Sequence, residues 1–284
     1  MLRPYRPEDL PAIVQMVQAG YAAPDAEIQA RIDGGHTLVY DDGQIKGLTV
    51  LTVDRSLPHS RGALILFIDP QFRGQGIGRA IWREIWPLLL AAGPASFTTF
   101  YRAGDTASAL FFSARGFNPL ASSQLMTYSG PSFPEPELTV RPYRDTWFSH
   151  YVQIKNAAFF SLRRESGLKP YMCYPDGSYD ESDLRAWLRE QEGKIFLGLA
   201  QEKPVGVLEL APPAIEVVAV APDQQGRGYG RALTQFGINR LKEQGVDPIR
   251  LHVLEKNQRA KALYESLGFT PGQTTEYARL TVEP

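Results

Sequence analysis

The sequence predicts an α/β protein that contains two tandem copies of one layered fold, each a mixed, mostly antiparallel sheet flanked by helices. Three observations predict this fold class. The chain has 284 residues, which is more than a single hydrophobic core usually supports. A glycine-rich segment and a Gly-Phe pair recur at one fixed spacing. Each copy also has the same order of apolar segments, in which pairs of strand-like segments alternate with helical patterns.

The internal repeat is visible in short sequence matches. Residues 73–80 read RGQGIGRA, and residues 225–232 read QGRGYGRA, 152 positions later. A Gly-Phe pair at 116–117 returns at 268–269, which is again a spacing of 152. Two separate matches on one register indicate a duplicated domain.

The second copy is longer than the first. The opening RPYR of residues 3–6 recurs at 141–144, only 138 positions later. The difference between the two spacings, 152 − 138 = 14, is the number of extra residues between the first strand and the glycine-rich loop of the second copy. Three prolines in the segment 129–137, SGPSFPEPE, indicate a linker. We therefore expect two domains, residues 1–130 and 137–284.

Hydrophobic periodicity places the elements of both copies in the same order. In the first copy we expect strand 2–5, helix 8–19, strands 36–40, 45–53 and 63–68, a long helix after the glycine loop, strand 96–101, and a last helix and strand. In the second copy we expect strand 138–143, helix 147–158, strands 195–200, 205–210 and 215–220, a long helix, strand 249–254, and a last helix and strand. Short turns between consecutive strands favour antiparallel pairing, with the helices covering the sheet.

Composition and charge argue against several classes of partner and compartment. Thirty basic and 31 acidic residues leave a formal net charge of -1, which gives no support to a nucleic-acid or anionic-membrane partner. The apolar stretches have strand length, and the first residues lack the apolar core of a signal peptide. The single cysteine, Cys173, suits a reducing compartment. The four histidines lack the spacing of metal ligands. We expect a cytoplasmic protein without a metal.

The second glycine-rich loop has the features of an anion site. The apolar strand 215–220 ends at Pro222, and glycines follow at the start of a helix. The unpaired N–H groups and the positive dipole end of that helix point at whatever binds there, and a pyrophosphate fits. Arg227 and Arg231 can add charge-assisted contacts. A tight packing turn is the alternative, and neither loop has the G-x-G-x-x-G spacing of dinucleotide sites. Because this context occurs twice, we favour phosphate binding.

Two motifs resemble those of a known family. The pattern V-x-P, followed by Q/R-x-x-G-x-G/A at a helix start, resembles the coenzyme A signature of the GCN5-related N-acetyltransferases (GNAT). Residues 257–269, NQRAKALYESLGF, resemble the family's other hallmark, N-x-x-A-x-x-L-Y-x-x-x-G-F. The second copy has both motifs and the first copy has one. The resemblance implies two tandem GNAT folds that use acetyl-CoA as co-substrate.

The resemblance also implies which residues bind acetyl-CoA. The strand before the loop would supply backbone partners for pantetheine, the loop amides would hold the pyrophosphate, and an asparagine at the last strand–helix junction would contact pantetheine. In the second copy the implied residues are Val218, Ala219, Val220, Gln225, Gly226, Arg227, Gly228, Tyr229, Gly230, Arg231, Asn257 and Ala260. In the first copy they are Ile68, Arg73, Gly74, Gln75, Gly76, Ile77, Gly78 and Arg79.

Tyr264 and Glu216 are the candidate catalytic residues. By the resemblance, Tyr264 hydrogen-bonds the coenzyme A sulfur and protonates the leaving thiolate, which suits a phenol with an ordinary pKa of about 10. An amine acceptor must lose a proton, and Glu216, within an otherwise apolar strand, is the candidate base, directly or through water. The alternatives are a core aromatic at Tyr264 and a solvated glutamate at Glu216. Glu209 and Glu255 are the further candidate bases.

The first copy departs from the family pattern at the catalytic positions. At the spacing of 152, Leu64 stands opposite Glu216, Phe112 opposite Tyr264, and Asp105 opposite Asn257. Leucine cannot accept a proton and phenylalanine cannot donate one. We therefore expect that the first copy has lost catalysis, and we leave open whether it still binds acetyl-CoA.

The leading function is an N-acetyltransferase that transfers the acetyl group of acetyl-CoA, in a ternary complex, to a primary amine of a small molecule or peptide. The alternatives are a non-catalytic acyl-CoA-binding or regulatory protein, a mycothiol-synthase-like enzyme, or an aminoglycoside acetyltransferase. In this family the region that corresponds to residues 158–193 lines the acceptor pocket, and here it is aromatic and acidic, which suits a cationic amine. The sequence leaves the acceptor and the oligomeric state open.

Overall fold

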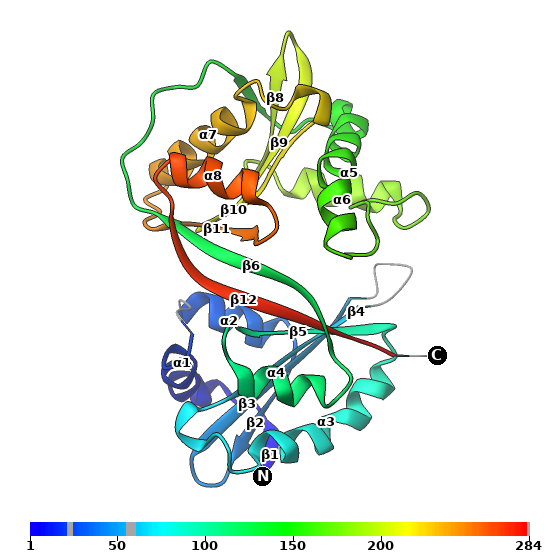
Figure 1. Cartoon of the computed structure of the whole chain (residues 1–284), viewed down its shortest axis with the longest axis vertical. Coiled ribbons are helices and arrows are strands. Elements are labelled where there is room, and N and C mark those ends of the chain that lie inside the picture. Colours follow the sequence, from blue (N-terminus) through cyan, green and yellow to red (C-terminus); the bar gives the residue numbers. More distant parts are fainter. Residues whose placement is uncertain (22–24, 55–60, 283–284) are drawn as a thin grey trace. The chain divides into compact units, whose positions relative to one another are not determined.

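The computed structural model describes residues 1–21, 25–54 and 61–282 (Figure 1). His59 and the last two residues of the chain therefore lie outside it. The chain divides into two compact units. The N-terminal unit comprises Met1–Pro119 and Tyr277–Pro284, and the C-terminal unit comprises Leu120–Glu276. The expected domain boundaries, 1–130 and 137–284, describe the two sequence copies and remain a prediction.

The N-terminal unit is a layered sheet with helices on both faces. Its elements are β1 (Leu2–Pro4), a 3₁₀ turn η1 (Pro7–Asp9), α1 (Leu10–Gln18), α2 (Asp25–Asp33), β2 (His36–Asp41), β3 (Ile45–Asp54), β4 (Arg61–Ile68), η2 (Pro70–Phe72), α3 (Ile77–Ala92), β5 (Ser96–Arg102) and α4 (Thr106–Ser113). The strand order is β1-β2-β3-β4-β5, followed by the end of β12 (Thr270–Thr281). The pairs from β1 to β4 are antiparallel, whereas β4 and β5 are parallel.

The alternating pattern of the strands gives the N-terminal unit two cores, one on each face of the sheet. On one face, α1 and α2 bury Ile13, Met16, Ile28 and Ile32 against β2 and β3. On the other face, α3 and α4 bury Ile81, Ile85, Leu89 and Phe112 against β4 and β5. Ala278, from the end of β12, belongs to this second core.

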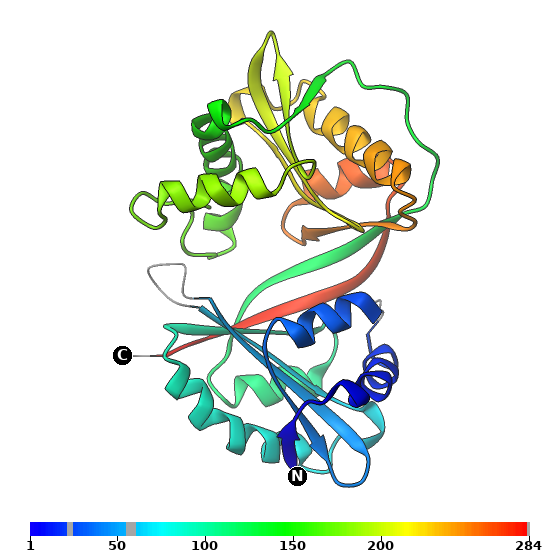
Figure 2. The same cartoon turned by 180° about the vertical axis from the view of Figure 1, so that it is seen from behind.

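The C-terminal unit repeats the same architecture (Figure 2). Its elements are β6 (Asn118–Tyr128), β7 (Thr139–Pro142), η3 (Asp145–Trp147), α5 (Phe148–Glu165), α6 (Glu181–Glu190), β8 (Ile195–Ala200), β9 (Lys203–Ala211), β10 (Ala214–Val220), η4 (Pro222–Gln224), α7 (Tyr229–Glu243), β11 (Ile249–Leu254), α8 (Gln258–Ser266) and β12. The strand order is β12-β6-β11-β10-β9-β8-β7. The predicted architecture, a mixed and mostly antiparallel sheet flanked by helices in each half, is confirmed.

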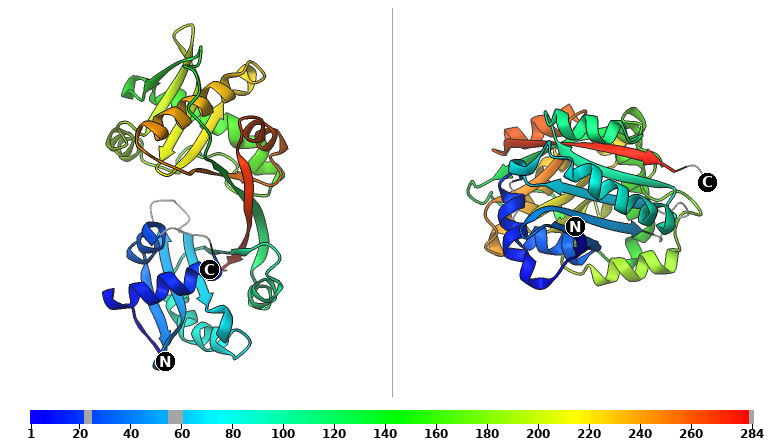
Figure 3. Two further views of the ribbon diagram at one scale, coloured as in Figure 1. Left: turned by 90° about the vertical axis from the view of Figure 1, so that its left-hand side faces the viewer. Right: turned by 90° about the horizontal axis from the view of Figure 1, so that it is seen from below.

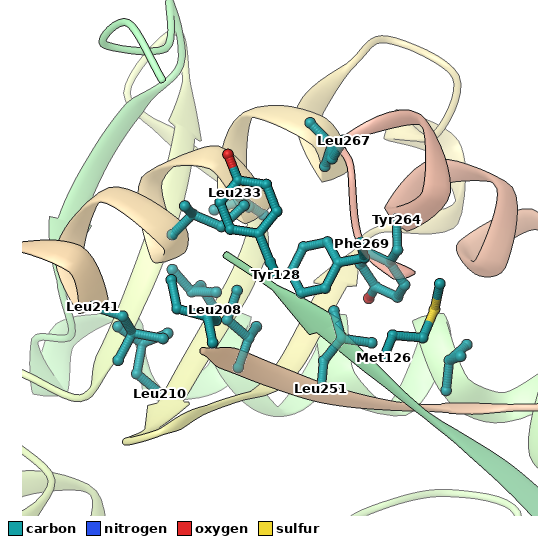
Figure 4. Close-up of a cluster of buried hydrophobic side chains, with 14 of the residues drawn as sticks. Met126, Tyr128, Leu208, Leu210, Leu233, Leu241, Leu251, Tyr264, Leu267 and Phe269 are labelled. Carbon is teal, nitrogen blue, oxygen red and sulfur yellow. The ribbon is translucent and has the colours of Figure 1, made fainter. Parts of the chain in front are cut away.

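The helices of the C-terminal unit also cover both faces of its sheet (Figure 3). On one face, α5 and α6 bury Tyr151, Ile154 and Leu188 against Leu197 and other residues of β8 to β10. On the opposite face, α7 and α8 cover a larger core that is drawn in Figure 4. The residues of that core include Met126, Tyr128, Leu208, Leu210, Leu233, Leu241, Leu251, Tyr264, Leu267 and Phe269.

The last strand of each sequence copy contributes to the unit of the other copy. Strand β6 ends the first copy, yet Met126 and Tyr128 are buried in the core of the C-terminal unit, and β6 pairs antiparallel with β11. Strand β12 ends the second copy, yet Ala278 is buried in the core of the N-terminal unit. Each core is therefore completed by a strand that the repeat assigns to the other half.

Candidate active site

The sheet of the C-terminal unit opens beside β10. Strand β10 pairs with β11 only at Ala214 and Ile215. On its other side, β10 pairs with β9 as far as Val220. From Val217 onward, in the part of the chain that the structure describes, the edge of β10 that faces β11 therefore has no strand beside it. An extended ligand can hydrogen-bond to such a free backbone edge as an added strand does.

A glycine loop lies at the end of this opened strand. Gly226 and Gly228 have φ values of 83° and 84°, a left-handed conformation that favours glycine. A Cβ added at either position would meet nothing within 4 Å, so their backbone conformation, and not crowding, requires glycine. Gly228 is the N-cap of α7, and the first N–H groups of that helix have no acceptor within the helix. The loop therefore leaves unpaired N–H groups accessible to a ligand.

Side chains hold the glycine loop in place. Gln225 Nε2 donates to the carbonyl oxygen of Val220 (3.1 Å), and Arg259 Nη1 donates to Gln225 Oε1 (2.6 Å). Arg231 donates to the hydroxyl of Ser266. Arg227 is exposed and, among the described residues, has no hydrogen-bond or ion-pair partner. It can therefore bind a phosphate without losing an existing contact. Arg259 was not among the residues predicted to bind acetyl-CoA, although it lies inside the second motif.

Asn257 and Ala260 are already in contact at the start of α8. Asn257 Oδ1 accepts the hydrogen bond of the Ala260 amide (3.2 Å) as the N-cap of the helix. Asn257 precedes the first turn of α8 and Ala260 lies within it, and this helix follows β11, the strand that borders the opening. The cap fixes the side-chain oxygen of Asn257 and leaves its Nδ2 group to donate elsewhere.

Tyr264 belongs to α8, and its side chain points into the core of the C-terminal unit. Its side chain is 8% exposed and packs against Phe269, with the ring centroids 5.8 Å apart. Figure 4 shows the ring among Phe269, Met126 and Leu251. Burial raises the pKa of Tyr264 to about 12. Within the described part of the chain, its hydroxyl has no hydrogen-bond partner. The phenol therefore keeps its proton at neutral pH and is able to donate it.

Glu216 occupies a β-bulge in β10. The register with β9 shifts between Ile215, opposite Leu210, and Val217, opposite Glu209, so Glu216 is the extra residue of the bulge. The sequence placed this carboxylate in an apolar strand, but its side chain is exposed. This exposure agrees with the alternative of a solvated glutamate, because the bulge interrupts the regular alternation of the strand. Glu216 is thus accessible at the point where β10 separates from β11.

The other two candidate bases are engaged in ion pairs. Glu209 Oε1 accepts from Lys155 Nζ at 2.6 Å and from the Tyr151 hydroxyl at 2.7 Å. Glu255 Oε2 accepts from Lys261 Nζ at 2.8 Å, and its Oε1 accepts from the hydroxyl of Thr274 at 3.3 Å. To act as a base, either residue would first have to exchange these contacts for a contact with the acceptor or with water.

The glycine loop of the N-terminal unit has the same shape, but its surroundings differ. Gly74 and Gly76 have φ values of 78° and 83°, and α3 begins at Ile77. Arg73 Nη1 forms an ion pair with Asp105 Oδ2 at 2.9 Å. Leu64 and Phe112, opposite the two catalytic candidates of the second copy, are 0% and 2% exposed. Their side chains therefore serve as core residues.

Tyr151 and Lys155, one helical turn apart on α5, were not predicted from the sequence as candidate functional residues. Both are buried, and both contact Glu209. The spacing of four residues on a predicted helix indicates that Tyr151 and Lys155 are neighbours, but it does not identify Glu209 as their partner.

The described residues include neither a helix suited to span a membrane nor a metal-binding cluster. None of the helices there combines the length and apolar character needed to cross a membrane. No group of three His, Cys, Asp or Glu side chains in that part of the chain is placed to hold a metal ion.

Both halves of the chain match models of one protein family. Residues 156–269 match the family model "Acetyltransferase (GNAT) family", and residues 33–119 match the model "Acetyltransferase (GNAT) domain". A curated relative named mycothiol acetyltransferase, from Thermobispora bispora, is 32% identical over 254 residues, which are 82% of this chain and 79% of the relative. The chain belongs to the GNAT family. It is an acetyl-CoA-dependent N-acetyltransferase, as the two motifs implied.

Other relatives and solved structures agree with this assignment. A mycothiol acetyltransferase from Rhodococcus opacus is 30% identical over 244 residues, with 75% of this GNAT chain and 73% of the relative covered. The crystal structure of a GCN5-related N-acetyltransferase from Sphaerobacter thermophilus superposes with a TM-score of 0.74 at 20% identity, covering 100% of this chain and 96% of that one. A tandem GNAT protein from the clavulanic acid biosynthesis pathway gives a TM-score of 0.67 at 15% identity, covering 100% and 99%. These two structures share the fold.

Proposed function

We propose that the C-terminal unit carries out the acetyl transfer, and that the acceptor is a primary amine of a small molecule. The observation that supports this assignment most is the opening of β10, which ends at the glycine loop and has Glu216 at its start. In this arrangement the pantetheine arm pairs with the free edge at Val218 to Val220, and the pyrophosphate binds at the loop of Gly226 to Arg231. Asn257 Nδ2 donates to the pantetheine arm.

The proposed reaction is direct attack of the amine on the thioester carbonyl. The nitrogen–carbon bond forms, the carbon–sulfur bond breaks, and the thiolate takes the proton of Tyr264. With its pKa raised to about 12, Tyr264 is protonated at neutral pH and can hydrogen-bond the sulfur as its negative charge develops. Glu216 removes the proton of the amine through a water molecule, because its exposed position gives it access to solvent. Positioning and charge stabilisation are sufficient for this reaction, and no covalent enzyme intermediate is needed.

We propose that the N-terminal unit does not catalyse transfer. It has neither an acid at Phe112 nor a base at Leu64, and both side chains are buried. Its loop geometry suits an anion, but Arg73 of the loop is already paired with Asp105. A phosphate that binds there would compete with this carboxylate for the arginine.

The names of the relatives suggest the first acceptor to test. Several relatives, at 26–32% identity over most of this chain, are named mycothiol acetyltransferase. We propose that the acceptor of this chain is a small amine of the kind that those enzymes acetylate. This suggestion comes from the relatives and not from the geometry of the site, because one fold serves many acceptors.

A calorimetric titration with acetyl-CoA tests which loop binds the co-substrate. Gly228→Trp and Gly76→Trp are matched variants, since both replace a left-handed glycine that begins a long helix. We expect the wild type to bind, Gly228→Trp to lose binding, and Gly76→Trp to retain it. Loss of binding only in Gly76→Trp, or no binding by the wild type, would contradict the assignment to the C-terminal unit.

A further inference from the structure

A cluster of polar side chains lies beside the opened strand, outside the residues assigned above. It consists of Tyr151 and Lys155 on α5, Tyr174 in the segment between α5 and α6, and Glu209 on β9, and we call it the Glu209 cluster. Glu209 is opposite Val217 in the register of β9 and β10. The cluster is therefore one strand away from the point where β10 separates from β11.

The cluster already contains a cation. Lys155 is 7% exposed, and its Nζ atom lies 2.6 Å from Glu209 Oε1. The same atom lies 5.0 Å from the centroid of the Tyr151 ring and 5.3 Å from that of Tyr174. The aromatic and acidic surroundings that the sequence suggested for a cationic amine are thus occupied by the chain's own ammonium group. A second cation here would be repelled at close range.

The hydrogen-bonding capacity of the cluster can be counted atom by atom. Lys155 has three protons, which it directs at Glu209 Oε1, the Tyr151 oxygen (3.0 Å) and the Tyr174 oxygen (3.3 Å). Tyr151 donates its single proton to Glu209 Oε1. In the 3.0 Å contact between the two hydroxyls, Tyr174 is therefore the donor. Burial and the neighbouring Glu209 raise the pKa of Tyr151, so its phenol stays protonated.

After these bonds are formed, the cluster has unused hydrogen-bond acceptors but no unused donor. Glu209 Oε2 has no hydrogen-bond partner among the described residues. This atom is not fully buried, so solvent reaches it. The oxygen of Tyr174 retains one lone pair. With Lys155 charged and Glu209 ionised, the net charge of the cluster is zero, so it is complementary to an uncharged hydrogen-bond donor.

Tyr174 is held firmly although it lies in a connecting segment. Asn156 Nδ2 donates to the carbonyl oxygen of Tyr174 (2.9 Å), and the Tyr174 amide donates to Asn156 Oδ1 (2.8 Å). Four residues earlier, the carbonyl oxygen of Pro170 accepts from Arg163 Nε (2.9 Å). These bonds attach the segment to α5 at two points, so the geometry of the cluster is built in advance of any ligand.

We propose that the Glu209 cluster binds a hydroxyl group of the acetyl acceptor, with Glu209 Oε2 accepting its proton. This inference rests on the proposed function, because it assigns the acceptor side of the same site. Glu209 is then an acceptor-binding residue and not the catalytic base. Lys155, Tyr151 and Tyr174 are positioning residues that fix its carboxylate. The site selects amines with a hydroxyl near the amino group over amines without one.

Two amines that differ by a single hydroxyl test this selectivity: trans-2-aminocyclohexanol and cyclohexylamine. Release of free coenzyme A from acetyl-CoA gives kcat/KM for each amine. We expect the wild type to prefer the amino alcohol by roughly tenfold or more, as expected for a hydrogen bond to a charged group. In Glu209→Gln the preference should fall to near one, because an amide N–H replaces the accepting oxygen. Tyr174→Phe, which keeps the ion pair, should reduce the preference less.

A control variant and an independent measurement separate this proposal from the proposed function. Glu243→Gln changes an exposed glutamate at the end of α7 and should leave the preference unchanged. Acetyl-CoA affinity by calorimetry should be the same in the wild type and all three variants. Lack of acetyl-CoA binding by the wild type would contradict the proposed function itself. Normal binding with equal use, or no use, of the two amines would overturn hydroxyl recognition, as would a preference that survives in Glu209→Gln.

Discussion

Replacement of Lys155 by methionine tests whether the ammonium group and Glu209 form a buried ion pair. The variant keeps most of the side-chain volume but leaves the Glu209 carboxylate, 14% exposed, without its cation. Removing one partner of a buried pair costs about 3–5 kcal/mol. For a unit of this size each kcal/mol lowers Tm by ~2–4 °C, so we expect Lys155→Met to lower Tm by roughly 6–20 °C.

Differential scanning calorimetry measures this change, and two further variants control it. Lys203→Met removes an exposed lysine from the start of β9 and should alter the stability by no more than about 0.5 kcal/mol. The double variant Lys155→Met/Glu209→Met replaces both charges with apolar groups and should recover much of the loss. Equal effects of Lys155→Met and Lys203→Met, or a double variant less stable than the single one, would refute the description of a buried pair.

Two other predictions concern the catalytic acid and the acid stability of the N-terminal unit. Tyr264→Phe keeps the ring that packs against Phe269 and should lower kcat by about 10²–10⁴ without changing Tm or acetyl-CoA affinity; a kcat within a factor of two of the wild type in steady-state assays would exclude the acid role. The hydrogen bonds from Arg3 lower the pKa of Asp9, so this carboxylate adds stability above its unfolded pKa of about 4, and that stability is lost as the pH falls through the lower folded value. Asp9→Asn should therefore lower the unfolding free energy by about 1–2 kcal/mol at pH 7 and reduce its decrease between pH 5 and 3, measured by urea titration; an unchanged pH dependence would show that the Arg3–Asp9 pair is not the cause.

Local patterns in the sequence were sufficient for the parts of the fold that depend on neighbouring residues. The strands before the two loops, predicted at 63–68 and 215–220, are observed as Arg61–Ile68 and Ala214–Val220. Both are short apolar runs that end shortly before a proline and a glycine loop, which is strong local information. The loops and their helix starts were predictable for the same reason, since a left-handed backbone conformation requires a particular residue type.

Features that depend on distant parts of the chain could not be read from these patterns. The alternation of β6 shows that Met126 and Tyr128 share a buried face, but it does not say which sheet the strand joins. The bulge at Glu216 exists only in relation to the register of β9. The pairing of Lys155 with Glu209 joins residues 54 positions apart. Such contacts depend on tertiary structure, for which a single sequence carries no direct signal.

The exchange of final strands gives a reason for the retention of the first copy. A second copy that stood alone would lose β6, and with it Met126 and Tyr128, from the core in which Tyr264 is buried. Selection on the second copy therefore also acts on residues of the first copy. Phe112 and Leu64 can stand at the positions of Tyr264 and Glu216 without making the first copy dispensable. The two copies repeat one sequence pattern, but each folded unit needs a strand from the other copy to complete its core.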